Sequence, residues 1–413
     1  NGTLDTTFDG DGKRVTSINS SADFANGVAL QLDGKIVIAA TTFNNVNSDF
    51  AVLRFNPNGS ADASFHGNGI MITDFGHGDG WGYGSAVALE TNGRVLVAGS
   101  HTNGFPARNF ALARYKSDGL LDNTFGSDGK VTTEFGINTN GIGYDNSANA
   151  IVVQPDGKII AAGTSLTYNS EPRLALARYN INGTLDTSFD GDGKLLFGSY
   201  LQGWAIALQP DGKIIVAGDT SYPSNTCCAN FVLMRFNSNG SPDNTFDKDG
   251  QVTTSFGANS IASVRSVLLQ PNGMILVAGY NYAGSYSDFA LARYNVNGSL
   301  DMSFDGDGKV TTHFGGSSSY ARGFDVAVQS DGKIVVAGNH YEELAGTFGD
   351  FALARYNPNG SLDTSFDSDG KLTMDFGNNN EENVFGVEAQ SDGKILVAGH
   401  SYGKLALARY LSN

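Results

Sequence analysis

The sequence predicts an all-β protein built from seven small antiparallel sheets, and three observations lead to this prediction. The chain has 413 residues, with 54 glycines and 34 aspartates but only 8 glutamates, whereas helical proteins favour Glu, Ala and Leu. Two stretches of characteristic sequence recur seven times along the chain. One of the seven copies of the second stretch is split between the two ends of the chain.

The first recurring stretch is an apolar run, a Gln or Glu, an Asp-Gly or Asn-Gly pair, and a second apolar run. This pattern is typical of a β-hairpin, and we expect a type I′ turn, in which both central residues have positive φ. Residues 326–329 and 333–337 then form the first and second strands of one repeat. The seven pairs are Asp33-Gly34, Asn92-Gly93, Asp156-Gly157, Asp211-Gly212, Asn272-Gly273, Asp331-Gly332 and Asp392-Gly393.

The second recurring stretch resembles FALARY, followed by an Asn-Gly turn, an acidic loop and Lys-Val-Thr-Thr, as in residues 289–312. Small Ala alternates with Phe, Leu and Tyr at a period of two, which predicts a third strand. The Lys-Val-Thr-Thr segment is rich in β-branched residues and predicts a fourth. Four short antiparallel strands in roughly sixty residues are typical of a β-propeller blade.

The ends of the chain favour a closed ring over an open array, because an open array needs polar caps at both ends. Residues 405–410 followed by residues 1–5 reproduce the internal passage 174–186 with one extra residue. We therefore expect residues 1–17 to complete the blade formed by 384–413. The whole chain, residues 1–413, is predicted to be a single seven-bladed β-propeller.

The passages VAVQSDGKIVVAG and FALARYNPNGSLDTSFDSDGKLT resemble the bacterial delta-sixty repeat, a β-propeller module of secreted and surface proteins. The resemblance covers essentially the whole chain. It implies the propeller fold and export from the cell, and it brings no catalytic residues with it. Two departures stand out: Met274 replaces the Lys that follows the hairpin turn, and residues 65–68 weaken the acidic loop of one copy.

The net charge of −16 disfavours nucleic acid and anionic lipid as partners, because no excess of cations is present to replace their counterions. No run of eighteen apolar residues occurs, so we expect no membrane insertion. We expect a secreted or cell-surface protein, present as a monomeric domain of a larger surface protein. The cysteines Cys227 and Cys228 are adjacent, and both a vicinal disulfide and two free thiols remain open.

The acidic loop carries up to three aspartates in each repeat. Oxygen ligands followed by Gly are typical of Ca²⁺ loops, but the bidentate Glu that ends an EF-hand loop is missing. The alternative is structural: the leading acid pairs with the single Arg of the third strand, and the other acids bond their own loop. The calcium hypothesis takes Asp186, Asp190 and Asp192, and likewise Asp301, Asp305 and Asp307, as the ligands.

One face of the predicted propeller receives loops that differ in length and composition, and such loops commonly carry binding sites. Aromatic and polar side chains gather at the strand starts on this face. Aromatic rings there suit stacking against sugars or a protein partner, although they could also seal the gaps between blades. The candidate ligand-binding residues are Trp81, Tyr83, Tyr144, Trp204, Arg265, Phe324 and Phe385.

Glu388 breaks the pattern of the first strand, where the other repeats place Ala, Val or Leu. Asp325 lies in the neighbouring repeat, and His340 and His400 follow the second strands of the same two repeats. Converging carboxylates and imidazoles could bind a metal or act as acid and base. We expect a non-enzymatic propeller that binds a glycan or protein, with a metal-assisted lyase or hydrolase using these four residues as the alternative.

Overall fold

The computed structural model describes most of the chain, and the described residues form 28 strands and no helix. None of the described segments is a helix that is long and apolar enough to cross a membrane. The described residues are 2–19, 21–76, 80–102, 107–136, 144–167, 171–220, 229–258, 260–284, 286–316, 319–342, 349–377 and 381–412.

The chain divides into two compact units, and each is described by itself. The first unit comprises Asn1–Thr16, Ala217–Arg235 and Asp243–Asn413, and the second comprises Ser17–Val216 and Phe236–Pro242. The prediction of one closed domain stays a prediction.

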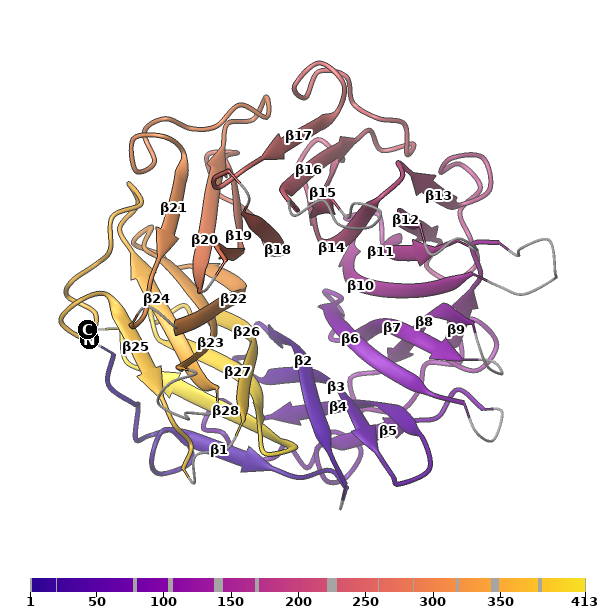
Figure 1. Ribbon diagram of the computed structural model, residues 1–413. Coiled ribbons are helices and arrows are strands. Elements are labelled where there is room, and N and C mark those ends of the chain that lie inside the picture. The colour runs from indigo at the N-terminus through magenta and orange to yellow at the C-terminus, as the bar shows by residue number, and fades with distance from the viewer. Residues whose placement is uncertain are drawn as a thin grey trace. The chain divides into compact units, whose positions relative to one another are not determined.

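The strands follow the repeats in groups of four (Figure 1). The first thirteen are β1 (Lys13–Thr16), β2 (Asp23–Leu30), β3 (Ile36–Phe43), β4 (Ser48–Phe55), β5 (Ile70–Thr73), β6 (Gly82–Leu89), β7 (Val95–Thr102), β8 (Arg108–Tyr115), β9 (Lys130–Thr133), β10 (Asp145–Val153), β11 (Ile159–Leu166), β12 (Pro172–Tyr179) and β13 (Lys194–Phe197). The others are β14 (Leu201–Leu208), β15 (Ile214–Thr220), β16 (Phe231–Phe236), β17 (Gln251–Thr254), β18 (Ile261–Leu269), β19 (Ile275–Tyr282), β20 (Ser287–Tyr294), β21 (Lys309–Thr312), β22 (Ser319–Val328), β23 (Ile334–Glu342), β24 (Asp350–Tyr356), β25 (Lys371–Met374), β26 (Glu382–Ala389), β27 (Ile395–Ser401) and β28 (Lys404–Tyr410).

The strands build seven four-stranded antiparallel sheets, which confirms the predicted fold class. The sheet orders are β2-β3-β4-β5, β6-β7-β8-β9, β10-β11-β12-β13, β14-β15-β16-β17, β18-β19-β20-β21, β22-β23-β24-β25 and β26-β27-β28-β1. One parallel pairing, Ser287 with Tyr320, joins the fifth and sixth sheets. The strand alternation seen in FALARY therefore corresponds to a real strand, the third of each sheet.

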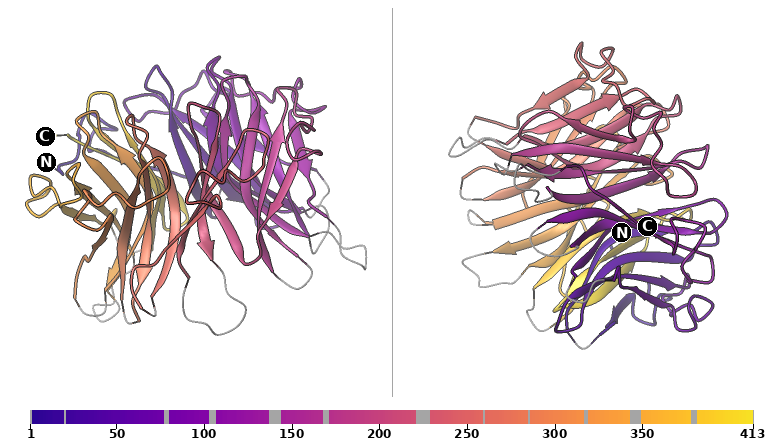
Figure 2. Two further views of the ribbon diagram at one scale, coloured as in Figure 1. Left: turned by 90° about the horizontal axis from the view of Figure 1, so that it is seen from above. Right: turned by 90° about the vertical axis from the view of Figure 1, so that its right-hand side faces the viewer.

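The N-terminal strand β1 supplies the fourth strand of the last sheet, as the sequence predicts. It pairs antiparallel with β28, from Lys13 opposite Ala408 to Thr16 opposite Leu405. The backbone N–H of Leu411 also donates to the carbonyl of Thr3 at 2.9 Å. The two ends of the chain accordingly lie side by side (Figure 2).

The hairpin turns are not type I′, so that prediction is wrong. Gly34 has a φ of +80°, but Asp33 does not have positive φ. The N–H of Gly34 donates to the carbonyl of Gln31, whose own N–H donates to the carbonyl of Lys35. This is a three-residue loop closed by a glycine in the left-handed conformation, and a single positive-φ residue is enough for it.

The first strand of most sheets contains a β-bulge that the sequence reasoning missed. In β6, for example, the pairing shifts between Gly84 and Ala86, so that Ser85 is the extra residue. The bulge pushes a carbonyl toward the second strand, where a Cβ on Gly99 would lie 1.8 Å from the Tyr83 oxygen. The recurrent Ala-Gly that ends the second apolar run thus leaves room for the bulge.

The core lies between successive sheets. In the second unit, Phe110 and Leu112 of one sheet pack with Ile159 and Ala161 of the next, and all four are fully buried. The Tyr that ends FALARY crosses to the neighbouring sheet, as when the Tyr179 hydroxyl donates to Thr133 Oγ1 at 2.7 Å. Burial of such tyrosines raises their pKa well above the usual value, so the hydroxyl remains a donor.

Each repeat also holds a buried ion pair, which confirms the structural interpretation of the leading acid. The Arg of the third strand lies 2.6 to 2.9 Å from the leading Asp in all seven repeats. The pairs are Arg54–Asp62, Arg114–Asp122, Arg178–Asp186, Arg235–Asp243, Arg293–Asp301, Arg355–Asp363 and Arg409–Asp5.

Six of the same arginines connect one repeat to the next. Arg114 Nη1 donates to the carbonyl of Ile181, and Arg355 Nη1 donates to the carbonyl of Ser412 at 2.9 Å. Within the described residues, each of these six contacts runs from the third strand of one repeat to the segment just after the third strand of its successor. We call this contact the seam bond.

Candidate functional site

An aromatic platform lies in the second unit, where the sequence predicted a ligand-binding surface. The rings of Trp81 and Tyr83 stack with centroids 6.4 Å apart and an interplanar angle of 20°. Phe43, at the end of β3, meets both rings edge-on at 6.1 and 6.5 Å. Trp81 is 39% exposed, which is high for so large an apolar side chain.

A charged pair lies next to this platform. Arg108, at the start of β8, donates from Nε and Nη2 to the two carboxylate oxygens of Asp145, both at 2.7 Å. The Asp145 hydrogen bonds raise the pKa of Arg108, and the charge of the ionised Tyr83 hydroxyl adds to this effect. Arg108 pairs in register with Thr102, whose N–H donates to the Trp81 carbonyl at 2.9 Å, so the charged pair and the aromatic rings lie at the same end of the sheet. The two side chains are 37% and 30% exposed, so their outer edges face solvent. The rings of Trp81, Tyr83 and Phe43, together with the Arg108–Asp145 pair, form a surface that we call the Trp81 patch.

Tyr144 adjoins the Trp81 patch through the backbone. It directly precedes Asp145, and Asn146 Nδ2 donates both to the Tyr144 carbonyl and to the Arg108 carbonyl. Three of the predicted ligand-binding residues, Trp81, Tyr83 and Tyr144, thus belong to one area of the second unit. Trp204 lies in β14 and is partly buried.

The other three predicted ligand-binding residues lie in the first unit, at bulges of the first strands. Arg265 and Phe324 are the extra residues of β18 and β22, and Phe385 is that of β26. Phe324 packs against Phe385 with centroids 5.1 Å apart. The Arg265 guanidinium lies over the Tyr280 ring at 5.3 Å. Phe324 and Phe385 are thus engaged with each other, and Arg265 with Tyr280.

Asp325 and Glu388, from adjacent strands β22 and β26, form a carboxyl pair. Asp325 accepts hydrogen bonds from Ser266 Oγ at 2.7 Å, from the Val387 N–H at 2.9 Å and from its neighbour Val326. Burial, followed by the charge of Asp325, raises the pKa of Glu388 to about 8. Glu388 is therefore protonated at neutral pH.

The two imidazoles do not join this carboxyl pair. His340 pairs in register with Ala321, four positions along β22 from Asp325, which is roughly 13 Å of strand. It contacts Ser319 Oγ at 2.9 Å instead. His400 stacks on Phe385 at 5.5 Å, and burial lowers its pKa to about 4. The predicted four-residue constellation is thus a carboxyl pair with two separate histidines.

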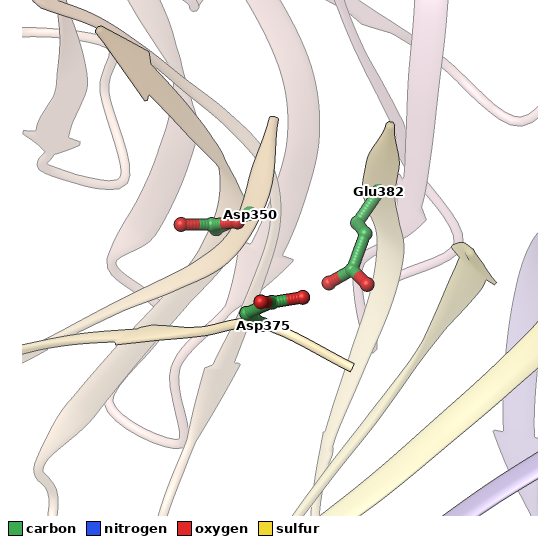
Figure 3. Close-up of side chains that lie close together, drawn as sticks. All are labelled: Asp350, Asp375 and Glu382. Carbon is green, nitrogen blue, oxygen red and sulfur yellow. The ribbon is translucent and has the colours of Figure 1, made fainter. Parts of the chain in front are cut away.

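One acidic cluster does converge, and it includes none of the predicted site residues. Asp350 starts β24, Asp375 follows β25, and Glu382 starts β26 (Figure 3). One carboxylate oxygen from each lies within 4.8 Å of the others, which makes this the only such group of potential metal ligands within the described ranges. Glu382 is buried, accepts from Phe376 N–H and Ser401 Oγ, and has its pKa raised to about 7, first by burial. The cluster could hold a cation or share a proton.

In each set of the calcium hypothesis, the first and third aspartates have protein partners for their carboxylates. Although burial alone would raise it, hydrogen bonds from Lys158 and Ser188 together with Arg178 hold the pKa of Asp186 below its usual value. Asp190 has a φ of +50°, a conformation that Asp tolerates better than most residues. Asp192 accepts from the Lys194 N–H at 2.8 Å. Asp301, Asp305 and Asp307 repeat this arrangement, and neither set of three brings its carboxylates within 4.8 Å of one another.

Sequence reasoning missed Phe43, Arg108 and Asp145 because they lie beside loops of irregular length, where no repeat pattern marks them. A polar residue before the start of FALARY, as in Arg108-Asn109, was the available signal. Cys227 and Cys228, for which the sequence leaves both a disulfide and two free thiols open, lie outside the described residues.

Comparison with known proteins identifies the repeat. The domain of unknown function (DUF5122) beta-propeller matches residues 31–65, 90–125, 154–189, 209–246, 270–304, 329–366 and 390–413, more than half of the chain. No curated protein matches the sequence.

Two solved structures share the fold. A catalytically inactive virginiamycin B lyase from Staphylococcus aureus with quinupristin matches at a TM-score of 0.53 and 11% identity, over 97% of this chain and 99% of that one. The polysaccharide lyase Uly1 matches at 0.52 and 10%, over 94% and 90%. The narrower likeness to the delta-sixty repeat stays a prediction. On its seven matching repeats, the chain belongs to the DUF5122 β-propeller family.

Proposed function

We propose that this protein is a non-catalytic β-propeller that binds a glycan at the Trp81 patch, outside the cell or on its surface. The observation that carries the proposal is the partly exposed Trp81–Tyr83 stack beside the bidentate Arg108–Asp145 pair.

The chemistry of the patch suits a sugar. The flat face of a pyranose carries C–H groups that pack on aromatic rings, while its hydroxyls need donors and acceptors at the edge. Arg108 and Asp145 hold each other in place, so their outer edges are already oriented before a ligand arrives.

Replacing Trp81 with alanine tests this proposal. We expect the variant to bind the best ligand from a glycan array at least about tenfold more weakly by calorimetry, because the stacking surface is lost. Tyr402→Ala is the matched control, since Tyr402 is 73% exposed in the other unit. Unchanged affinity in Trp81→Ala, or an array without any ligand, would contradict glycan binding. If Trp81 is needed to bind a protein and no glycan binds, the ligand is a protein instead of a glycan.

The carboxyl pair supports a second candidate, a metal-assisted lyase or hydrolase. A Glu388 that is protonated at neutral pH has the property that a general acid needs. Neither His340 nor His400 lies beside the pair in the part of the chain that the structure describes, which is why we favour binding. Release of reducing ends from a polysaccharide by the wild type, and its loss in Glu388→Gln, would establish the enzyme instead.

Calcium binding stays a separate prediction. If the acidic loops or the Asp350 cluster hold Ca²⁺, millimolar calcium is expected to raise the melting temperature and a chelator to lower it. Glu382→Gln separates the two locations, because it removes one ligand of the cluster and leaves the loops intact. Identical melting temperatures with calcium and with chelator would exclude both.

A further inference from the structure

Three tyrosine rings lie in a row in the first unit. Tyr282 ends β19 of the fifth sheet, whereas Tyr320 and Tyr341 belong to β22 and β23 of the sixth (Figure 1). The rings of Tyr282 and Tyr320 have centroids 6.2 Å apart and an interplanar angle of 15°, and those of Tyr320 and Tyr341 are 4.8 Å apart at 10°. All three side chains are partly exposed. The row is thus a nearly parallel aromatic surface that a ligand can reach.

The strand register explains this row. Ser287, the first residue of β20, pairs with Tyr282 of its own sheet and also with Tyr320 of the next sheet. Tyr320 in turn pairs with Tyr341. Each ring is therefore held at its place by backbone pairing.

Arg322 lies two residues beyond Tyr320 on β22, on the same face of the strand and roughly 7 Å further along it. Eleven of the thirteen arginines have a nitrogen within 3.7 Å of a carboxylate oxygen. Arg322 has neither an ion pair nor a hydrogen bond from its side chain to any residue that the structure describes. The side chain is partly exposed, and Nε is its only buried nitrogen. Its two outer nitrogens are thus available to a ligand.

Tyr280 lies beside this free guanidinium, two residues before Tyr282 on β19. The guanidinium of Arg322 lies over its ring at 5.4 Å, and that of Arg265 at 5.3 Å. Arg265 Nη2 donates to the Tyr280 hydroxyl at 3.2 Å, so this hydroxyl keeps its own proton to donate. Asp219 lies 3.7 Å from Arg265 and balances its charge, which leaves the charge of Arg322 uncompensated.

The phenol groups of the row have hydrogen-bonding capacity to spare. Within the described ranges, the hydroxyls of Tyr282 and Tyr341 make no hydrogen bond, and neither hydroxyl is buried. A ligand that carries several hydroxyls of its own can therefore use them. We call Arg322, Tyr280 and the three tyrosines of the row the Arg322 site.

We propose that the Arg322 site binds a hexuronate, which is a sugar ring that carries a carboxylate. A guanidinium with two free nitrogens matches a carboxylate in geometry and in charge. The C–H face of the sugar packs on the tyrosine rings, which lie within the length of one sugar unit from Arg322, and its hydroxyls bond the phenols. A neutral sugar leaves the arginine without a counter-charge, and a flat aromatic acid leaves the phenol hydroxyls without a partner.

Methyl β-D-glucuronide and methyl β-D-glucoside test this proposal, because they differ only in the carboxylate that replaces a CH₂OH group. Labelling the tyrosine rings with ¹³C gives NMR signals from 16 residues. We expect saturable shifts of Tyr280, Tyr282, Tyr320 and Tyr341, with the glucuronide binding at least about tenfold more tightly than the glucoside. Added salt should weaken the binding of the glucuronide and leave that of the glucoside unchanged.

Arg322→Gln is expected to weaken glucuronide binding at least about tenfold and to leave glucoside binding unchanged. Arg322→Lys keeps the charge but loses the paired donors, so it should retain part of the affinity. Arg173→Gln is the matched control, because Arg173 also has no carboxylate partner among the described residues but lies in the second unit. It should bind both sugars like the wild type. Tyrosine signals from outside the site show whether each variant is folded.

Equal binding of the two sugars, or equal glucuronide binding by Arg322→Gln, would overturn the site. Tighter binding of benzoate than of the glucuronide at the same tyrosines would show that the ligand is an aromatic acid and would contradict the proposal. Shifts confined to Tyr83 and Tyr144 would assign the glucuronide to the Trp81 patch instead. Because that patch belongs to the other unit, either proposal can fail while the other stands.

Discussion

Arg293→Met is expected to lower the free energy of unfolding by about 3–5 kcal/mol, because it removes one partner of a buried ion pair and leaves the other charged. Arg293 and Asp301 are each 8% exposed at their side chains. The substitution also removes the seam bond to the Pro358 carbonyl, at 2.5 Å. No second cation replaces the arginine, since position 274 is Met rather than Lys.

Arg355→Met is the matched comparison. Its partner Asp363 keeps Lys333 Nζ at 3.0 Å, so we expect a smaller loss than for Arg293→Met. Arg14→Met removes an exposed pair with Asp9 and should cost no more than about 1 kcal/mol. Urea unfolding measures the free energy of unfolding of the three variants, and so gives the order of their losses. Equal losses for Arg293→Met and Arg14→Met would show that the buried pair contributes little.

Glu388→Gln is expected to change how stability depends on pH. Burial, with the added charge of Asp325, raises the pKa of Glu388 from 4.5 to about 8. The folded state therefore holds a proton that the unfolded state has released, and the free energy of unfolding falls as pH rises through this window. Each pKa unit corresponds to about 1.4 kcal/mol, so the wild type should lose several kcal/mol between these limits.

In Glu388→Gln the amide does not titrate, so the variant lacks the fall in the free energy of unfolding with pH that Glu388 causes. It should match the wild type near pH 4 and exceed it in stability at pH 8, as measured by urea unfolding at a series of pH values. Glu382→Gln is the control: Glu382 also has a raised pKa, but to about 7, so its part of the slope ends at a lower pH. Parallel pH profiles of the wild type and Glu388→Gln would contradict the raised pKa of Glu388.

The strands and the buried ion pairs could be predicted because each depends on a short, repeated stretch. FALARY shows its alternation locally, and an Arg in an apolar strand requires a carboxylate nearby. The turn conformation was predicted wrongly because Asp-Gly occurs in both two- and three-residue loops, and the choice depends on the strand register. The bulge at Ser85 leaves no trace in the first strand itself, only the glycine at position 99.

The candidate sites could be predicted only in part. Trp81 and Tyr83 are close in sequence, so their proximity in the structure could be predicted. Arg108 and Asp145 are 37 residues apart and meet because two sheets pack together. Asp350, Asp375 and Glu382 come from three strand ends, and no repeated pattern brings them to attention.

The seam bond has a consequence for how such a chain can grow. In each of the six contacts described, one repeat supplies the arginine donor and its successor supplies the backbone carbonyl, as Arg54, Ser117, Arg114 and Ile181 illustrate. A segment copied in frame by tandem gene duplication therefore brings both halves of the contact with it. The new neighbour is compatible from the first generation, before any substitution is selected. Divergence can then be confined to the loops, where Trp81 lies, and to the strand starts beside them, where Arg108 lies.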